Sequence, residues 1–165
     1  MAEIKGIDVS RWNGNIDWKT VASYGMGFAI LRITEKGNIV DSTFEPNYKG
    51  CIENKIPVGV YKYSYATTIA QIKNEANVVI KTLNKRKLDY PVFLDIEDKC
   101  QENLSDSLMM KMIEHLELLL SKLDINLVFI AAILGIRTSY QKVLKSMIVG
   151  LLDILIMIPV NYRKD

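Results

Sequence analysis

The feature that most restricts the fold of this chain is a regular alternation of short apolar segments with longer amphipathic ones. Four segments of strand length are almost wholly apolar: residues 4–9, 28–33, 57–63 and 91–97. Segments with helical character lie between and after them: residues 17–23, 44–54, 68–85 and 105–123. Strands that are apolar on both faces and alternate with helices are typical of parallel βαβ units. The first 125 residues therefore predict an α/β fold, either a barrel of the TIM type or an open doubly wound sheet.

Local signals agree with these boundaries. Asp17 is a residue type that caps a helix N-terminus, and Gly25 follows at a distance suited to a helix stop. Pro46 is compatible only with the first turn of a helix. Over residues 68–85, the apolar positions recur every three or four residues and predict one face packed on a core. They are Ile69, Ile72, Ala76, Val79 and Leu83.

Composition argues against several classes of function. Charged residues make up 24% of the chain and the formal net charge is +2, which favours neither a nucleic-acid partner nor a membrane surface. His115 is the only histidine, so a zinc site built on several histidines is excluded. Cys51 and Cys100 lie far apart, and we interpret them as two thiols of a protein made in a reducing compartment.

Neither end of the chain predicts insertion into a membrane. Residues 1–6 lack the apolar stretch of a secretory signal, so we expect synthesis in the cytoplasm and another exit route before any extracellular action. Two apolar stretches, residues 127–136 and 147–160, lie near the C-terminus. Each is shorter than the roughly 20 residues that a membrane-spanning helix needs, so we expect no integral membrane span.

Acidic side chains interrupt the apolar segments where two predicted strands end. Asp8 lies near the end of the first strand, and Asp95 and Glu97 lie at the end of the fourth. The C-terminal ends of parallel strands form the active-site face of an α/β fold. Residues two apart on a strand also share a face. We therefore expect these three carboxylates to lie together.

Clustered carboxylates raise one another's pKa, because ionising all of them together costs Coulomb energy. One acid can then stay protonated and act as a general acid while another stays ionised, which is the chemistry of glycoside hydrolysis. On spacing alone, two alternatives stay open. The acids could be helix caps or solvated loop residues, or they could form a Mg²⁺ or Ca²⁺ site that also includes Asp98.

Aromatic side chains lie close to these acids in the predicted fold. Tyr61 and Tyr63 share one face at the end of the third strand, and Trp12 follows Asp8 after a short loop. Sugar rings are recognised by flat aromatic faces with polar groups nearby. Core packing explains any one of these residues, but it does not predict that they gather at one end of the sheet.

These motifs resemble those of the family 25 lysozymes, a family of glycoside hydrolases. Residues 6–14 (GIDVSRWNG) with 16–18 (IDW) resemble the opening of the family. Residues 32–35 (RITE), followed by Asp41, Phe44 and Asn47, resemble its second strand and the loop after it. Residues 56–61 (IPVGVY) and 90–97 (YPVFLDIE) resemble its third and fourth strands. The resemblance covers roughly residues 4–125, with the motifs in the family's order.

The resemblance implies a modified TIM-like β/α barrel that cleaves the β-1,4 bond between N-acetylmuramic acid and N-acetylglucosamine in peptidoglycan, as an autolysin or phage endolysin does. It implies Glu97 as the general acid. Asp95 would stabilise or orient the reacting 2-acetamido group or the positive charge at the anomeric carbon, and Asp8 would hold the substrate. Retention of anomeric configuration is implied, with no metal or cofactor. The residues implied in substrate binding are Tyr61, Tyr63, Trp12 and Arg32.

The resemblance ends near residue 125. The family pattern continues with a strand that ends in aromatic and serine residues, and later with a strand of the type WIAxY, and residues 126–165 contain neither. We therefore combined the last base of each codon with the first two bases of the next. Residues 127–136 can then encode SIYSSNTWY, and residues 147–160 can encode YDCWIARYPNNDTG. We interpret residues 1–125 as the N-terminal part of a catalytic domain and residues 126–165 as an apolar tail placed out of frame by a one-base change near codons 126–127.

Such a tail has physical consequences for the barrel. Without its last native strands, the barrel is incomplete and leaves unpaired strand edges, and its cleft loses one wall. Catalysis requires the reacting groups to be placed within about 0.5 Å, so we expect little activity from this exact chain. The alternatives to an active muramidase are a catalytically inactive relative and a metal-dependent hydrolase that uses the same carboxylates.

Overall fold

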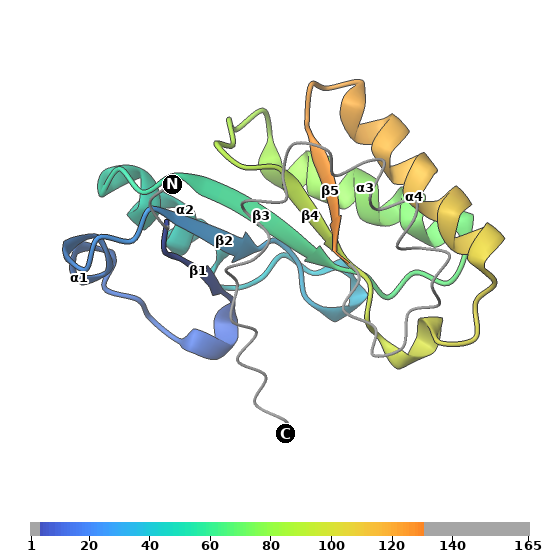
Figure 1. Ribbon diagram of the computed structural model, residues 1–165, viewed down its shortest axis with the longest axis horizontal. Coiled ribbons are helices and arrows are strands. Elements are labelled where there is room, and N and C mark those ends of the chain that lie inside the picture. The colour runs from blue at the N-terminus through green and yellow to red at the C-terminus, as the bar shows by residue number, and fades with distance from the viewer. Residues whose placement is uncertain (1–3, 131–165) are drawn as a thin grey trace.

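The computed structural model describes residues 4–130, which form a parallel five-stranded sheet with helices packed against it (Figure 1). The strands are β1 (Gly6–Val9), β2 (Phe28–Arg32), β3 (Val58–Tyr63), β4 (Val92–Asp95) and β5 (Leu127–Ile130). Each strand pairs with the next one along the chain, in the order β1-β2-β3-β4-β5. A doubly wound sheet would reverse direction at a switch point, whereas this order is that of a β/α barrel. The predicted α/β class, with a barrel that is incomplete, is confirmed.

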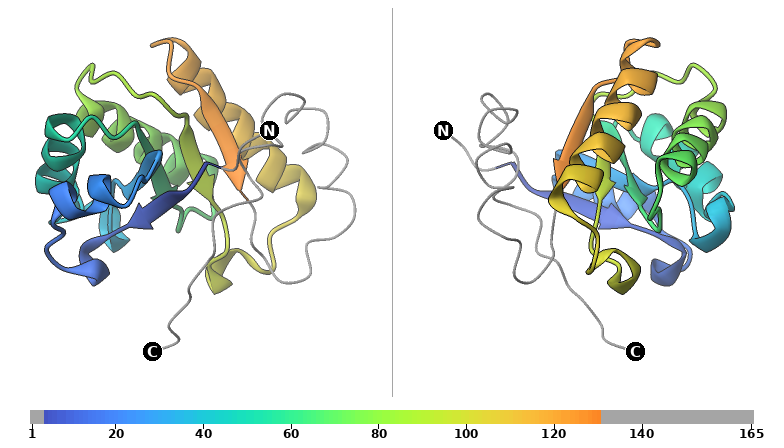
Figure 2. Two further views of the ribbon diagram at one scale, coloured as in Figure 1. Left: turned by 60° about the vertical axis from the view of Figure 1, so that its left-hand side comes forward. Right: turned by 90° about the vertical axis from the view of Figure 1, so that its right-hand side faces the viewer.

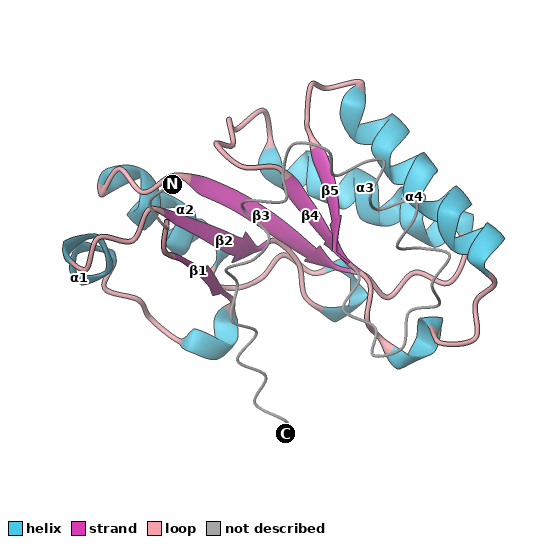
Figure 3. Ribbon diagram, viewed as in Figure 1, coloured by secondary structure: helices cyan, strands magenta, loops and turns pink. Residues whose placement is uncertain are grey.

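The helices are close to the ranges that the sequence predicts (Figure 3). They are α1 (Trp18–Ser23), α2 (Phe44–Glu53), α3 (Ile69–Leu83) and α4 (Asp106–Ser121), with short 3₁₀ helices η1 (Arg11–Asn13), η2 (Lys36–Asn38) and η3 (Lys99–Gln101). The caps explain the starting points. The Asp17 carboxylate accepts hydrogen bonds from the backbone N–H groups of Lys19 and Thr20, and the Thr68 hydroxyl accepts one from Gln71.

One face of the sheet packs against the helices, which lie along its outer side (Figure 2). This outer face alternates with the inner one along every strand, because successive side chains point to opposite faces. Its side chains are fully or almost fully buried together with the apolar stripes of α2, α3 and α4. On the sheet they are Ala29, Leu31, Val58, Val60, Val92 and Leu94.

The inner face of the sheet carries a different set of residues. Phe28, Ile30 and Phe93 form a small apolar cluster with Tyr61 and Tyr90 against it. This cluster fills the space between the strands away from their C-terminal ends. The polar residues of the inner face therefore lie above it, at the C-terminal edge.

The contact between α1 and α2 explains two of the motif residues, Trp18 and Asn47. The Trp18 indole is buried and donates a hydrogen bond of 3.2 Å to the Asn47 side chain. Gly50 faces the same indole from α2, and a Cβ atom at this position would overlap the ring. These contacts fix α1 against α2 and so fix the loop that follows β1.

The sheet continues beyond the predicted end of the catalytic segment at residue 125. Leu127–Ile130 pairs in parallel with β4, with Leu127 opposite Val92 and Ile130 opposite Asp95. Most of the predicted out-of-frame tail, residues 131–165, lies outside the described residues. Within residues 4–130, no helix combines the length and the apolar character that crossing a bilayer requires.

Candidate active site

The structure brings several predicted site residues to one edge of the sheet. Asp8, Arg32, Tyr63 and Asp95 occupy inner-face positions at the C-terminal ends of β1 to β4. The strand register staggers them: Asp8 is opposite Ile30, Arg32 is opposite Tyr61, and Tyr63 is opposite Asp95. They nevertheless share one edge, because the C-terminal ends of parallel barrel strands lie on the same side of the sheet.

Glu97 reaches this edge in a different way from the one that the sequence predicts. The strand β4 ends at Asp95, so Glu97 lies in the loop that follows and not within the strand. Ile96 between them is fully buried, whereas Asp95 and Glu97 are both partly buried. Their carboxylates interact electrostatically, so the predicted pairing of the two acids is present although its strand geometry is not.

The pKa values of all three acids are raised, with burial as the first cause of each shift. Burial and the negative charges of Glu97 and Asp8 together raise the pKa of Asp95 to about 7, against the opposing charge of Arg32. Burial and the Asp98 charge raise the pKa of Glu97. Partial burial of its carboxyl also raises the pKa of Asp8, although the residue as a whole is exposed.

Two carboxyl oxygens at the centre of this cluster lack a hydrogen-bond partner within the described part of the chain. They are Oδ1 of Asp95 and Oε1 of Glu97, and both atoms are buried. A buried oxygen without a donor favours the protonated form of a carboxyl or a bound group that supplies a donor. Asp95 and Glu97 are therefore placed so that they can hold a proton or accept a hydrogen bond from a ligand.

Aromatic rings form a wall beside the acids. The Arg32 guanidinium lies 5.7 Å from the centre of the Tyr63 ring, and Tyr63 and Tyr65 have ring centroids 5.0 Å apart. Burial raises the pKa of Tyr63, and the charges of Glu97, Asp98 and Asp95 raise it further. Sequence reasoning missed Tyr65. The signal that could have found it is the continued spacing of two from Tyr61 through Tyr63.

Trp12 does not join this wall through any contact among the described residues. It lies in η1, and its side chain is 73% exposed. The Arg11 guanidinium covers its ring at 4.5 Å and also forms an ion pair of 2.6 Å with Glu35. The structure therefore places Trp12 on the rim of the site, beside the loop that follows β2.

A buried polar network behind the tyrosines is a second feature that the sequence reasoning missed. Lys62 points to the outer face of β3 between the two tyrosines, is fully buried, and forms an ion pair of 3.3 Å with Glu75 of α3. Glu75 also accepts hydrogen bonds from the Ser64 hydroxyl at 2.7 Å and from the Tyr65 backbone at 3.0 Å. Gln101 of η3 joins through Ser64 at 3.3 Å and the Ala66 carbonyl at 2.9 Å.

This network connects the loops that follow β3 and β4. The first loop carries Tyr65, and the second begins with Glu97 and leads into η3. A charged lysine inside an otherwise apolar strand was the available signal, because buried lysines require a partner.

The other polar candidates have local explanations. The Asp98 carboxylate, which the metal-site alternative included, accepts a hydrogen bond of 3.0 Å from the Cys100 backbone and caps η3. Within residues 4–130, no three His, Cys, Asp or Glu side chains are placed to hold a metal ion. Cys51 and Cys100 are both free thiols, the first buried and the second exposed.

Comparison with known proteins gives consistent results. The model of "Glycosyl hydrolases family 25" matches residues 7–123. An uncharacterised Escherichia coli protein, YegX, is 34% identical over 101 residues, which are 58% of this chain and 36% of YegX. Lysozyme M1 of Streptomyces globisporus is 41% identical over 61 residues, which are 37% of this chain and 21% of that protein. This chain thus spans about a third or less of the length of these curated relatives.

Solved structures are similar over a larger part of the chain. The bacterial lysozyme of Streptomyces coelicolor is 28% identical, with a TM-score of 0.66, over 79% of this chain and 64% of that one. A family 25 glycosyl hydrolase of Bacillus anthracis is 27% identical, with a TM-score of 0.62, over 78% of this chain and 60% of that one. In both comparisons about a third or more of the solved chain has no counterpart in the matched part of this one.

Proposed function

Because this chain belongs to glycosyl hydrolase family 25, we propose that its acidic edge is the catalytic centre of a peptidoglycan muramidase. The bond cleaved is the β-1,4 linkage between N-acetylmuramic acid and N-acetylglucosamine, and the site of action is the cell wall. The observation that carries the proposal is the meeting of Asp8, Asp95 and Glu97 at one sheet edge, all with raised pKa. Lysozyme M1 and the solved lysozymes support the assignment by their similarity.

Glu97 is the proposed general acid. The pKa of Asp95 is about 7 with the opposing Arg32 charge included, so near neutral pH this carboxyl is ionised in part of the molecules. In our proposal the productive form has Asp95 ionised and Glu97 protonated. Glu97 delivers its proton to the leaving oxygen, while ionised Asp95 stabilises the positive charge that develops at the sugar.

Asp8 and the aromatic wall complete the proposed site. Asp8 is accessible on the inner face, where it can accept hydrogen bonds from sugar hydroxyls. Tyr61, Tyr63 and Arg32 form the side of the cleft, and rim-exposed Trp12 offers the ring face opposite Arg11 to a more distant sugar.

We also propose that residues 126–165 are encoded out of frame and that the alternative frame supplies the missing strands. The boundary near residue 125 falls just before β5, which pairs with β4 in the given frame. Sequencing the locus on both strands tests this directly. A verified DNA sequence in which the alternative frame contains stop codons would reject the proposal.

Zymography on bacterial cell walls tests the assignment of Glu97 in a chain whose residues from 127 onward follow the alternative frame, because we expect little clearing from the chain as it stands. Glu97→Gln removes the transferable proton but keeps the side-chain size, so we expect the clearing by the frame-restored chain to be lost. Glu102→Gln in the same chain is the matched control, because Glu102 is exposed and lies at the end of η3 outside the cluster. Clearing by Glu97→Gln equal to that of the frame-restored chain would contradict the role. Loss of clearing in the presence of EDTA would favour a metal-dependent hydrolase instead.

A further inference from the structure

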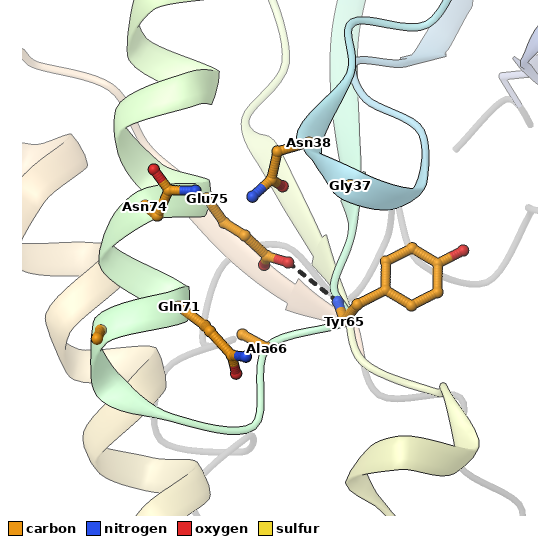
Figure 4. Close-up of a pocket in the computed structure, with 8 residues that line it drawn as sticks. Gly37, Asn38, Tyr65, Ala66, Gln71, Asn74 and Glu75 are labelled. Carbon is orange, nitrogen blue, oxygen red and sulfur yellow. Dashed lines mark hydrogen bonds between the residues drawn. The ribbon is translucent and has the colours of Figure 1, made fainter.

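A pocket of about 310 Å³ lies beside Tyr65 of the aromatic wall (Figure 4). It is lined by η2, by the loop after β3 and by the first turns of α3. This volume is at the small end of the range for ligand pockets, which begins at about 300 Å³. The pocket is adjacent to the proposed catalytic centre because Tyr65 lines it and Tyr65 stacks with Tyr63.

Side-chain amides dominate the polar lining of the pocket. Asn38 faces it from η2, and Gln71 and Asn74 face it from α3 (Figure 4). Gln71 uses its oxygen to accept hydrogen bonds from the backbone and hydroxyl of Thr67, which leaves its NH₂ group able to donate. Each amide provides donors and acceptors without a charge, and this is the complement of a peptide group.

The charges around the pocket also suit a peptide ligand. Glu75 lies at its inner end, but the ion pair with Lys62 compensates its charge. Lys36 precedes the lining residue Gly37, is exposed, and its ammonium lies 5.5 Å from the Tyr65 ring centre. Its charge also acts on Asp98. One cation thus lies beside a lining whose own acid is compensated, which suits a short peptide that carries a carboxylate.

A further sugar ring fits this pocket less well. Sugar recognition uses an open aromatic face, and among residues 4–130 Tyr65 is the only aromatic residue that lines the pocket. Lys36, Lys62 and the Tyr63 ring all lie within 6.0 Å of the Tyr65 ring centre. Figure 4 also shows the Tyr65 ring directed away from Gln71 and Asn74.

We propose that this pocket is a subsite for the peptide that muramic acid carries in peptidoglycan. The proposal rests on the muramidase function, because a muramic acid bound at the acids would carry its peptide sideways along the tyrosine wall. The amides of Asn38, Gln71 and Asn74 pair with the peptide groups, and Lys36 pairs with a carboxylate of the stem. The subsite selects glycan strands whose peptides are present.

Titration of the full chain with two probes tests the subsite, with binding followed by NMR amide shifts. Muramyl dipeptide contains the sugar and two residues of the stem, whereas N-acetylmuramic acid contains the sugar alone. We expect the dipeptide probe to shift the signals of Gly37, Asn38 and Asn74, and the sugar alone to leave them in place. A dipeptide probe that does not bind, or that shifts none of these signals, would overturn the proposal.

A pair of matched variants tests whether a single lining amide contributes to binding of the peptide. Asn74→Ala removes one amide from the pocket, and Asn77→Ala makes the same change one turn further along α3, at an exposed position outside the lining. Losing one hydrogen bond should weaken binding of muramyl dipeptide by about threefold to tenfold in Asn74→Ala. We expect no change in Asn77→Ala, and no change in either variant for N-acetylmuramic acid. Equal affinities for muramyl dipeptide in Asn74→Ala and the parent would overturn the subsite.

The subsite and the acid assignment are tested by different readouts. Asn74 lines the pocket and is tested by binding of muramyl dipeptide, whereas Glu97 does not line it and is tested by lysis. If Glu97→Gln retained lysis, the acid assignment would fail while the subsite stood. If Asn74→Ala left binding unchanged while Glu97→Gln abolished lysis, the subsite would fail while the acid assignment stood.

Discussion

The buried ion pair between Lys62 and Glu75 allows a double-mutant test of how the tyrosine loop is held. The side chains of the two residues are 1% and 4% exposed, and their charged atoms are 3.3 Å apart. The perturbations are Lys62→Met, Glu75→Gln and the two combined. Each single change leaves one buried charge without its partner, whereas the double change removes both charges.

The structure sets the expected magnitudes. Removing one partner of a buried ion pair costs about 3–5 kcal/mol, because the remaining charge is uncompensated. Lys62→Met should cost less than Glu75→Gln, because Glu75 keeps hydrogen bonds from Ser64 and Tyr65. Lys62 in Glu75→Gln keeps only the Tyr63 carbonyl at 2.6 Å. We expect the double variant to be more stable than Glu75→Gln alone by about 1–3 kcal/mol.

Urea unfolding followed by circular dichroism measures these differences. The matched control is the exposed pair Lys49–Glu53, which lies one helical turn apart on α2 at 3.7 Å with side chains 76% and 62% exposed. Lys49→Met and Glu53→Gln should each change the unfolding free energy by less than about 0.5 kcal/mol. A double variant at positions 62 and 75 whose loss equals the sum of the two single losses would refute the reasoning.

Two further predictions concern the acids and the α1–α2 contact. Folding raises the pKa of Asp95 from 3.8 to about 7, so the folded state holds this proton more tightly, and the stability it provides at low pH is lost as the pH rises from about 4 to about 7. Asp95→Asn should therefore lose less stability than the parent between these two pH values in urea unfolding; a parallel decline in both proteins would contradict the pKa. Gly50→Ala should lower the melting temperature by an amount equivalent to about 1–3 kcal/mol, although alanine favours helices, because its Cβ overlaps the Trp18 indole. An unchanged melting temperature would show that α1 shifts away without cost.

Much of the fold could be predicted because the signals are local. The Asp17 cap, the first-turn position of Pro46 and the apolar stripe of residues 68–85 each specify an element without reference to the rest of the chain. The choice between a barrel and a doubly wound sheet could not be made from periodicity. It depends on which strands pair, and both arrangements use the same parallel apolar strands.

The candidate site could be predicted in part for a similar reason. Asp8 and Asp95 lie on strands, where a spacing of two fixes the face, and the structure places them on the same side. Glu97 lies beyond the strand, where the loop conformation decides its direction. Trp12 lies in a 3₁₀ turn that has a local capping box but also contacts distant residues, because Arg11 pairs with Glu35 and its backbone N–H donates to Asp41, 24 and 30 positions away.

The polar network behind the site depends on contacts that sequence patterns do not reveal. Lys62 lies on the outer face of β3 because Tyr61 and Tyr63 occupy the inner one, and it is tolerated there because Glu75 faces it from α3. Gln101 completes the network from 37 residues beyond Ser64. Such pairing follows from the packing of α3 on the sheet, which is a property of the folded chain.

The identity of the sugar at newly formed reducing ends tests the central claim most directly. Purified peptidoglycan is digested with the parent chain, with a chain whose residues from 127 onward follow the alternative frame, and with Glu97→Gln in that second chain. The fragments are then reduced with borohydride and identified by mass spectrometry. The account predicts fragments that end in N-acetylmuramic acid from the frame-restored chain, few from the parent and none from Glu97→Gln. Fragments that end in N-acetylglucosamine, or no fragments from the frame-restored chain, would contradict it.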